Sequence, residues 1–398
     1  MIAIHAQTER KRLDRSVRCA EKRRPWARKQ RLRGLIRPDP AVCATAGAAC
    51  GRKSLSSARI QAIFTSNDTP LGECRIMGSF ALELLLCVLA FGFGYAANQG
   101  GTCLVVAAHE LHRRQPPKMF VGFLAASAAA GLVAVPIVWT GTLGATLAPS
   151  TSINFLLLIG AIAFGLGALI NDTCLLGSLA RLGDGEMRLL ALPAGLAVGI
   201  LAADFGRLGP VATWPSFIAR PSAPGAAALL ALSLVLALAM IFVSRKTPPR
   251  RRQSWAFGAS MIGLGITGGL LYALSPAWTF ADLIQRGLPL RMSPTGEVAL
   301  VAVIASVAGA ITASVRQGRL RLQRPTAVGI LRSIAGGALM GIGIGLIPGG
   351  NDALILAAMP TLSPGGIVAY LVMTATIVFG FEARDRLARK GASVHRGG

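Results

Sequence analysis

Charged, aromatic and metal-binding side chains are scarce in this sequence. Of its 398 residues, 15% are charged, 6% are aromatic and 4 are histidine. The histidines and cysteines show no metal-ligand spacing, the chain has no nucleotide-binding loop, and isolated G-x-G pairs are too weak to indicate a dinucleotide site. We therefore expect no metal, no cofactor and no catalytic residues, which argues against an enzyme.

Cysteine is also too rare for a disulfide framework in a chain of this length, which has 7. Four of them lie in a basic N-terminal stretch and three in the apolar body: Cys19, Cys43, Cys50 and Cys74, then Cys87, Cys103 and Cys174. A free cysteine in an apolar environment most often behaves as a small buried hydrophobe. This is the expectation for Cys87, which lies in a leucine run.

Apolar residues and glycine are abundant. Hydrophobic residues make up 53% of the chain, which has 47 glycines, and the mean hydropathy is +0.57. This composition excludes an ordinary soluble domain. Apolar windows long enough to cross about 30 Å of hydrocarbon begin near residues 79, 119, 153, 188, 224, 256, 296, 328 and 364. The sequence predicts an all-α polytopic membrane protein with about nine transmembrane helices in a lipid bilayer.

Positive charge is concentrated at the start of the chain. The formal net charge is +24, and residues 1–76 contain 17 Lys and Arg against 6 Asp and Glu. These residues have no long apolar run and no periodicity, so we expect a disordered basic extension without the apolar region of a signal peptide. A nucleic-acid-binding arm is the alternative. We favour a natural start at Met77, just before the first apolar window, and no nucleic-acid partner.

The remaining positive charge lies mostly in short loops and indicates the topology. Basic clusters occur at 113–118, 244–253, 316–324 and 384–390, and an even number of apolar windows separates each cluster from the next. Loops rich in Lys and Arg face the cytoplasm. We expect all four clusters, and the C-terminus, on the cytoplasmic side of a bacterial inner membrane. The first helix would then start outside, unless residues 79–112 enter and return on one side by breaking at Gly100–Gly101.

Two segments of the first half resemble each other. FGFGYAANQGGTCL begins at residue 91 and FGLGALINDTCL begins 73 residues later, at residue 164. With a two-residue gap, they share Phe, two Gly, Asn, Thr, Cys and Leu, so that Asn98, Thr102 and Cys103 correspond to Asn171, Thr173 and Cys174. The chain therefore repeats a glycine-rich helix that ends in polar residues.

The second half has two further glycine-rich segments, GLGITGGLLYAL at 263–274 and GIGIGLIPGGNDAL at 341–354. The fifth window, 224–243, leaves four windows on either side. Because this single connector helix crosses the membrane once, the second half has the opposite orientation to the first. We expect a first membrane half over 77–223, a connector helix and basic loop over 224–254, and an inverted second half with a basic tail over 255–398. All four glycine-rich segments are predicted to be broken or re-entrant helices, the arrangement with which many transporters build a central site.

Polar residues at these breaks are the candidates for a substrate pathway, because polar groups are costly in lipid and mark function by default. Glycine alone is also explained by close helix packing. The candidates are Asn98, Gln99, Thr102, Cys103, Asn171, Thr173, Cys174, Gly349, Gly350 and Asn351, with Asp172 and Asp352 as structural support. Half-helix N-termini favour an anion, and a thiol offers a weak donor and a polarisable sulfur. The combination suits a soft, sulfur-containing anion.

Three segments together resemble the YeeE/YedE family of membrane proteins, also called the sulphur transport family. They are FGFGYAANQGGTC, INDTCLLGSLARLGDGE and LMGIGIGLIPGGNDALIL followed by MPTLSP, and the resemblance covers residues 78–382. It implies uptake of thiosulfate or a related sulfur compound, with pore cysteines that pass the anion inward, often to a cytoplasmic TusA-like sulfur carrier. Since the chain has no nucleotide-binding motif, we expect transport without ATP.

Carried over by residue, the family's first two pore cysteines match Cys103 and Cys174, while its third has no counterpart because no cysteine follows residue 174. Asn351 occupies the comparable break, and we expect its amide to face the pathway. Asp352 is expected to turn away and to accept backbone hydrogen bonds or pair with a basic side chain. The alternatives are a membrane-embedded redox sensor or accessory subunit of a sulfur-metabolism complex, and an exporter of sulfur compounds.

Overall fold

The structure, a computed structural model, describes residues 72–141, 144–205, 212–246, 251–276, 278–285, 294–347 and 349–394. Within these ranges, nine helices are long and apolar enough to cross a membrane, and each contains one of the nine predicted windows. The predicted all-α polytopic membrane fold is confirmed. Most of the expected basic extension, residues 1–71, lies outside the described residues, whereas residues 72–76 form the start of the first helix.

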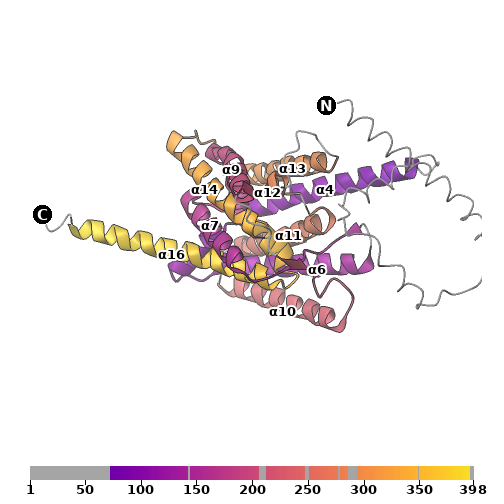
Figure 1. The fold of residues 1–398 in the computed structure, drawn as a ribbon. Coiled ribbons are helices and arrows are strands. Elements are labelled where there is room, and N and C mark those ends of the chain that lie inside the picture. Colours follow the sequence, from indigo (N-terminus) through magenta and orange to yellow (C-terminus); the bar gives the residue numbers. More distant parts are fainter. Residues whose placement is uncertain are drawn as a thin grey trace, which may run out of the picture. The chain divides into compact units, whose positions relative to one another are not determined.

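The elements follow one another in the order that Figure 1 labels in part. The first half contains α4 (Gly72–Gly100), α5 (Leu104–His112), α6 (Lys118–Thr140), α7 (Phe155–Asn171), α8 (Leu175–Gly183), the short 3₁₀ helix η4 (Met187–Ala191) and α9 (Leu192–Phe205). After α10 (Ala223–Lys246) come α11 (Arg251–Leu274), α12 (Phe280–Gln285), α13 (Pro294–Arg316), α14 (Ala327–Leu346), α15 (Asn351–Ala353), the π-helical turn η5 (Leu354–Ala358) and α16 (Pro364–Val394). Two short antiparallel strands, β1 (Ser150–Thr151) and β2 (Thr213–Trp214), pair between loops.

The helix contacts occur in equivalent pairs, as expected for two inverted halves that pack against each other. Helix α4 packs against α13 as α11 packs against α6, and α14 packs against α9 as α7 packs against α16. Helices α4 and α11 also contact each other, as do α7 and α14. This pattern results if α4, α6, α7 and α9 correspond in order to α11, α13, α14 and α16. Helix α10 packs mainly on α6, and only 22% of its apolar window is buried, as befits a peripheral connector.

Four breaks interrupt helices within the two halves, and one of them lies outside the segment in which it was predicted. Breaks separate α4 from α5, α7 from α8 and α14 from α15, as expected. The predicted break within 263–274 is wrong, because α11 continues to Leu274 and the chain breaks only afterwards, before α12. Pro276 explains the position, since a proline disfavours helix in the preceding residue and cannot continue the ladder.

The glycines of α11 serve packing. A Cβ atom at Gly269 would lie 2.7 Å from Cα of Ala130 on α6, and one at Gly268 would lie 2.6 Å from the side chain of Leu356. Small residues of this kind let membrane helices approach closely. The glycine pattern therefore indicates a close helix contact here, and the break is specified by the proline that follows.

Candidate functional site

The sulfur atoms of Cys103 and Cys174 lie 3.9 Å apart. Each cysteine is the N-cap of the short helix that follows its break, Cys103 for α5 and Cys174 for α8. Both side chains are buried, with 3% and 0% of their surfaces exposed. The sequence repeat thus places two thiols at equivalent helix starts that face one another.

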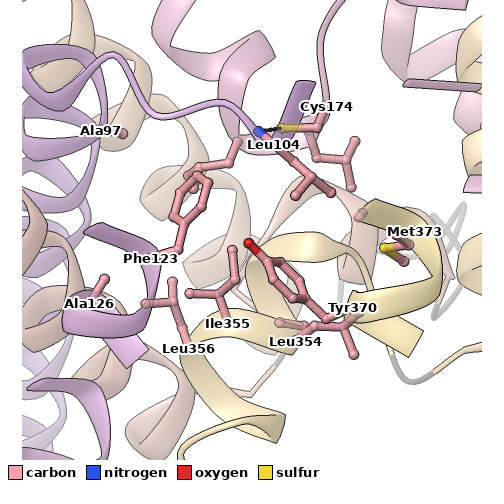
Figure 2. Packing of buried hydrophobic residues seen from close by; sticks show 14 of the residues in the cluster. Ala97, Leu104, Phe123, Ala126, Cys174, Leu354, Ile355, Leu356, Tyr370 and Met373 are labelled. Carbon is pink, nitrogen blue, oxygen red and sulfur yellow. Dashed lines mark hydrogen bonds between the residues drawn. The ribbon is translucent and has the colours of Figure 1, made fainter. Parts of the chain in front are cut away.

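Backbone donors from both helix starts converge on Cys174. Its sulfur accepts hydrogen bonds from the backbone N–H of Leu104, at 3.2 Å, and of Gly177, at 3.4 Å. Figure 2 shows the first of these bonds, which joins the N-terminus of α5 to the N-cap of α8. Because a helix N-terminus carries a partial positive charge, two such ends directed at one point favour negative charge there.

Gly177 allows the thiols to meet the first turn of α8. A Cβ atom at this position would lie 2.6 Å from the sulfur of Cys103 and 2.5 Å from Oγ1 of Thr173. The Thr173 hydroxyl itself lies 3.6 Å from the Cys103 sulfur. The space beside the first thiol therefore exists only because residue 177 has no side chain.

Asn351 completes this cluster from the second half of the chain. Its side-chain Nδ2 donates to the sulfur of Cys174 at 3.4 Å, while its Oδ1 has no hydrogen-bond partner among the described residues. Gly349 has a φ of +90°, a left-handed conformation that favours glycine, and Gly350 is the N-cap of α15. A Cβ atom at Gly350 would lie 2.5 Å from the side chain of Leu175. Both glycines let the break approach α8 closely enough for the amide to reach the thiol.

Asn98, at the end of α4, has its hydrogen-bonding groups occupied by the protein. Its Nδ2 donates to the carbonyl of Ala180 at 2.8 Å and to Oδ1 of Asp184 at 2.9 Å. The guanidinium of Arg319 donates to both its backbone carbonyl and its side-chain Oδ1, each at 2.8 Å. These contacts satisfy the carbonyl freed at the helix end.

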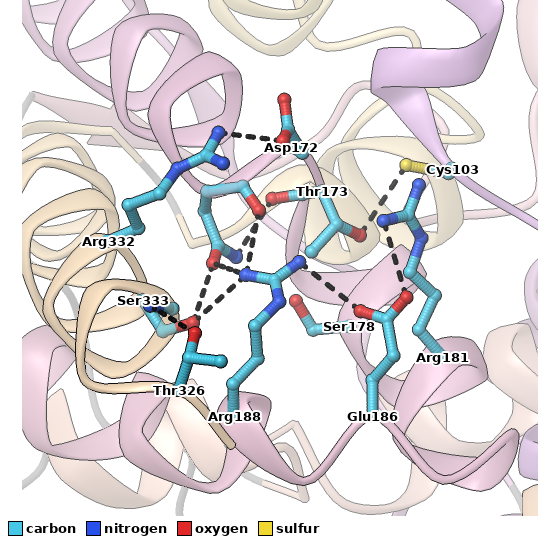
Figure 3. A network of polar contacts seen from close by, with 12 residues as sticks. Cys103, Asp172, Thr173, Ser178, Arg181, Glu186, Arg188, Thr326, Arg332 and Ser333 are labelled. Atoms are coloured by element: carbon cyan, nitrogen blue, oxygen red, sulfur yellow. Dashed lines mark hydrogen bonds and ion pairs between the residues drawn. The ribbon is translucent and has the colours of Figure 1, made fainter. Parts of the chain in front are cut away.

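Asn171, at the end of α7, is held in the same way by Arg188, an arginine that Figure 3 shows paired with Glu186. Arg188 donates to its backbone carbonyl at 3.2 Å and to its Oδ1 at 3.1 Å, and Ser333 donates to the same Oδ1 at 3.0 Å. Next to it, Asp172 adopts a left-handed conformation, with a φ of +59°, and forms an ion pair with Arg332 at 2.6 Å. The two repeated asparagines thus have matching arginine clamps.

The other predicted residues differ in how they are placed. Thr102 is fully buried and donates to the carbonyl of Ala97 at 3.1 Å, within its own break. Gln99 is half-buried at the end of α4. Cys87 is partly buried within α4 and lies outside the thiol cluster.

The carboxyl group of Asp352 is bonded to a tyrosine rather than to a thiol. Its Oδ2 accepts a hydrogen bond from the hydroxyl of Tyr272 at 3.0 Å. The expected basic partner is not found, because the ion pairs among the described side chains involve other acids, namely Asp172, Asp184, Glu186, Glu382 and Asp385. A tyrosine from α11 takes the place expected for a cation.

A cavity of about 350 Å³ reaches the break that carries Asn351, because Gly349 and Ala353 line it. It is lined by residues of both halves, among them Thr146, Thr151, Thr213, Tyr272, Gly349 and Ala353. Among the described residues of its lining, the polar groups are hydroxyls and backbone, without a charged side chain.

The geometry agrees with a comparison against protein families. The family model described as "Sulphur transport" matches residues 99–379 of the chain, a range that includes both cysteines and Asn351. The chain belongs to the sulphur transport family. It is thus a multi-pass membrane protein of a family of transporters for sulfur compounds. No curated protein matches the chain.

Sequence reasoning missed several residues that shape the site of this sulphur transport protein. Arg319 belongs to the basic cluster at 316–324, which topology alone explains, and Arg188 lies at the start of an apolar window, where no role is indicated. In the structure, Arg319 pairs with Asp184 and Arg188 with Glu186, two acids of the second motif. Tyr370 was missed because aromatic residues in α16 resemble ordinary core. It is 1% exposed, its hydroxyl has no partner among the described residues, and Figure 2 shows that hydroxyl directed toward the side of Leu104 and Cys174.

Proposed function

We propose that the protein is a permease that imports thiosulfate or a related sulfur-containing anion. The observation that carries this proposal is the cluster of Cys103, Cys174 and Asn351, in which two thiols and an amide from three helix breaks meet within hydrogen-bonding distance. The sulphur transport family supports the general activity. The particular anion, the direction and the pathway residues are our inference from the site.

Each group of the cluster has a chemical role in this proposal. The thiols of Cys103 and Cys174 donate weak S–H hydrogen bonds and offer polarisable sulfur to the terminal sulfur of the anion. Asn351 supplies an N–H donor where the family uses a third cysteine, and its neutral amide does not repel the anion. The N-termini of α5 and α8 stabilise the negative charge without binding it irreversibly.

The remaining predicted residues act at different distances from the anion. Asn98 and Asn171 have their polar groups occupied by the arginine clamps, so we assign them to fixing the two cysteine-bearing breaks. Thr102 and Thr173 hold the backbone beside the thiols. Gln99 lies at the end of α4, where it would meet the anion after the cluster.

We further propose the cytoplasmic membrane of a bacterium as the location. The basic loops at 113–118, 316–324 and 384–390 then face the cytoplasm, as the distribution of Lys and Arg requires. The hydroxyl-lined cavity opens to the outside, and the arginine clamps lie toward the cytoplasm. A TusA-like carrier that accepts sulfur at the basic face is the partner expected there.

Uptake in cells that lack their own thiosulfate transporters tests this function. Cells producing the protein are given radiolabelled thiosulfate, sulfate, sulfite or selenite in parallel, with a vector control. Accumulation of thiosulfate above the control supports the proposal, and preference for another anion revises the substrate. Loss of preloaded anion, without uptake, indicates export.

A redox sensor is the second candidate, because two thiols 3.9 Å apart can be oxidised to a disulfide. The burial of both thiols argues against it, since reactive cysteines are accessible. Alkylation of intact membranes with a thiol reagent, before and after peroxide, separates the two functions. A sensor predicts peroxide-dependent protection and no accumulation of anion.

A further inference from the structure

Asp352 is a buried acid that the proposed pathway does not use. We propose that Asp352 binds a proton that enters together with the anion, which makes the transporter proton-coupled. This inference rests on the proposed function. It begins from one residue, 7% exposed, whose Oδ1 has no hydrogen-bond partner among the described residues, while the backbone N–H groups of Asp352 itself and Ala353 lie close to the carboxyl group.

Among the described residues, no ion pair includes this carboxyl group. The void that it lines is shared with residues of α4, α8, α13 and the segment before α12, none of them charged: Phe93, Leu175, Leu176, Leu179, Trp278, Thr279, Val303 and Ser306. Two titratable groups are linked to it by hydrogen bonds, the hydroxyl of Tyr272, bonded to Oδ2, and the thiol of Cys174, bonded to the neighbouring Asn351. An unpaired carboxylate in such surroundings is costly, and a proton removes that cost.

The position of Asp352 links it to the anion. The amide of the preceding residue, Asn351, contacts the Cys174 thiol, so an anion at the thiols lies one residue from the carboxyl group. Two negative charges at this separation in an environment of low polarity repel each other strongly. Anion binding and protonation of Asp352 therefore favour each other, which is the thermodynamic requirement for cotransport.

Asp352 also lies between two spaces that can carry a proton. Tyr272, its hydrogen-bond donor, and Ala353, its neighbour in sequence, both line the 350 Å³ cavity. On another side, Asp352 itself lines a void of about 20 Å³ that extends to Leu179, one turn further along α8 toward the basic loops. A void of this size holds about one water molecule.

The step is a simple proton transfer. A hydronium ion in the cavity gives its proton to the Tyr272 hydroxyl while that hydroxyl passes its own proton to Oδ2 of Asp352, so the ion becomes water and the carboxyl group becomes neutral as the anion reaches the thiols. When the anion has left toward the basic loops, the group loses this proton to water on the same side. One proton then accompanies each anion through this site.

Transport by the purified protein in liposomes tests the inference, with the membrane potential clamped by potassium and an ionophore. Uptake of radiolabelled thiosulfate is measured with and without a pH difference of about one unit, acid outside, while an enclosed dye reports proton entry. For one proton per anion, this difference raises the accumulation ratio about tenfold. The variants are D352N, which cannot titrate, and D352E, which can.

Coupling predicts that wild type and D352E respond to the pH difference and admit protons with thiosulfate, whereas the transport that D352N retains does not respond. Uptake by wild type that ignores the pH difference and moves no protons overturns the inference but leaves the proposed function intact. A D352N variant with the full response overturns the assignment to Asp352. Stimulation by a sodium gradient at constant pH overturns the proton as the coupled ion. If wild type transports no sulfur anion under any gradient, the proposed function itself fails.

Discussion

Replacing Asn351 with leucine should strongly slow transport while the protein stays folded. The amide is fully buried at the thiol cluster, donates to the sulfur of Cys174 at 3.4 Å, and has an Oδ1 without a partner in the described part of the chain. Leucine has the same branched shape and number of side-chain heavy atoms but no polar atom, so the substitution removes the donor and leaves no new polar group unpaired. Packing around this break should therefore change little.

The size of the effect follows from the hydrogen bond that is lost. A hydrogen bond to a charged partner contributes about 1.5–3 kcal/mol, and about 1.4 kcal/mol corresponds to a factor of ten. If the Asn351 amide binds the anion at the narrowest point, Asn351→Leu lowers the uptake rate about 10- to 150-fold. Asn351→Cys restores a weak donor of the kind that the family uses, and should recover part of this loss.

The assay is the initial rate of radiolabelled thiosulfate uptake, normalised to the amount of protein in the membrane. Size-exclusion profiles and thermal unfolding in detergent confirm that each variant is folded. Normal transport by Asn351→Leu, with no gain from Asn351→Cys, would show that this position is structural. The pathway would then be confined to the first half of the chain.

Two further predictions concern the supports of the site. Gly177→Ala should abolish uptake, because its Cβ atom would lie 2.6 Å from the sulfur of Cys103; Gly263→Ala, whose Cβ atom would lie an ordinary 3.7 Å from its neighbour, is the matched control and should transport normally. Arg319→Gln should lower the free energy of unfolding by about 1 kcal/mol, at the low end for unpaired acceptors because the side chain is 40% exposed. Arg321→Gln, whose side chain is exposed nearby, should leave the melting temperature unchanged in the same thermal scans.

The fold could be predicted largely from the sequence, because hydropathy and loop charge constrain a membrane protein strongly. All nine windows lie in spanning helices, and the repeated Asn–Thr–Cys pattern correctly marks two equivalent helix breaks, one before α5 and one before α8. These predictions succeed because they depend on chain length and on equivalent positions in a repeat. Neither requires knowledge of which helices touch.

The predictions fail where contacts between distant parts of the chain determine the structure. The glycines in 263–274 indicate a break, but in the structure they allow α11 to contact α6 closely. The helix ends only after Leu274, just before Pro276. Asn98 and Asn171 carry the same polar signal as Asn351, yet Arg319 and Arg188 already donate hydrogen bonds to their side-chain oxygens. A sequence shows that a polar residue lies at a break, but only the fold shows whether the protein already satisfies its hydrogen bonds.

The central claim is that the anion passes the paired thiols, and one comparison tests it most directly. Wild type, Cys103→Ala, Cys174→Ala and Cys87→Ala are purified, placed in liposomes and assayed for uptake of radiolabelled thiosulfate. We expect Cys103→Ala and Cys174→Ala to remain folded and to lose transport, and Cys87→Ala, which lies outside the cluster within α4, to resemble wild type. Equal transport by all four proteins would contradict the claim and remove the thiols from the mechanism.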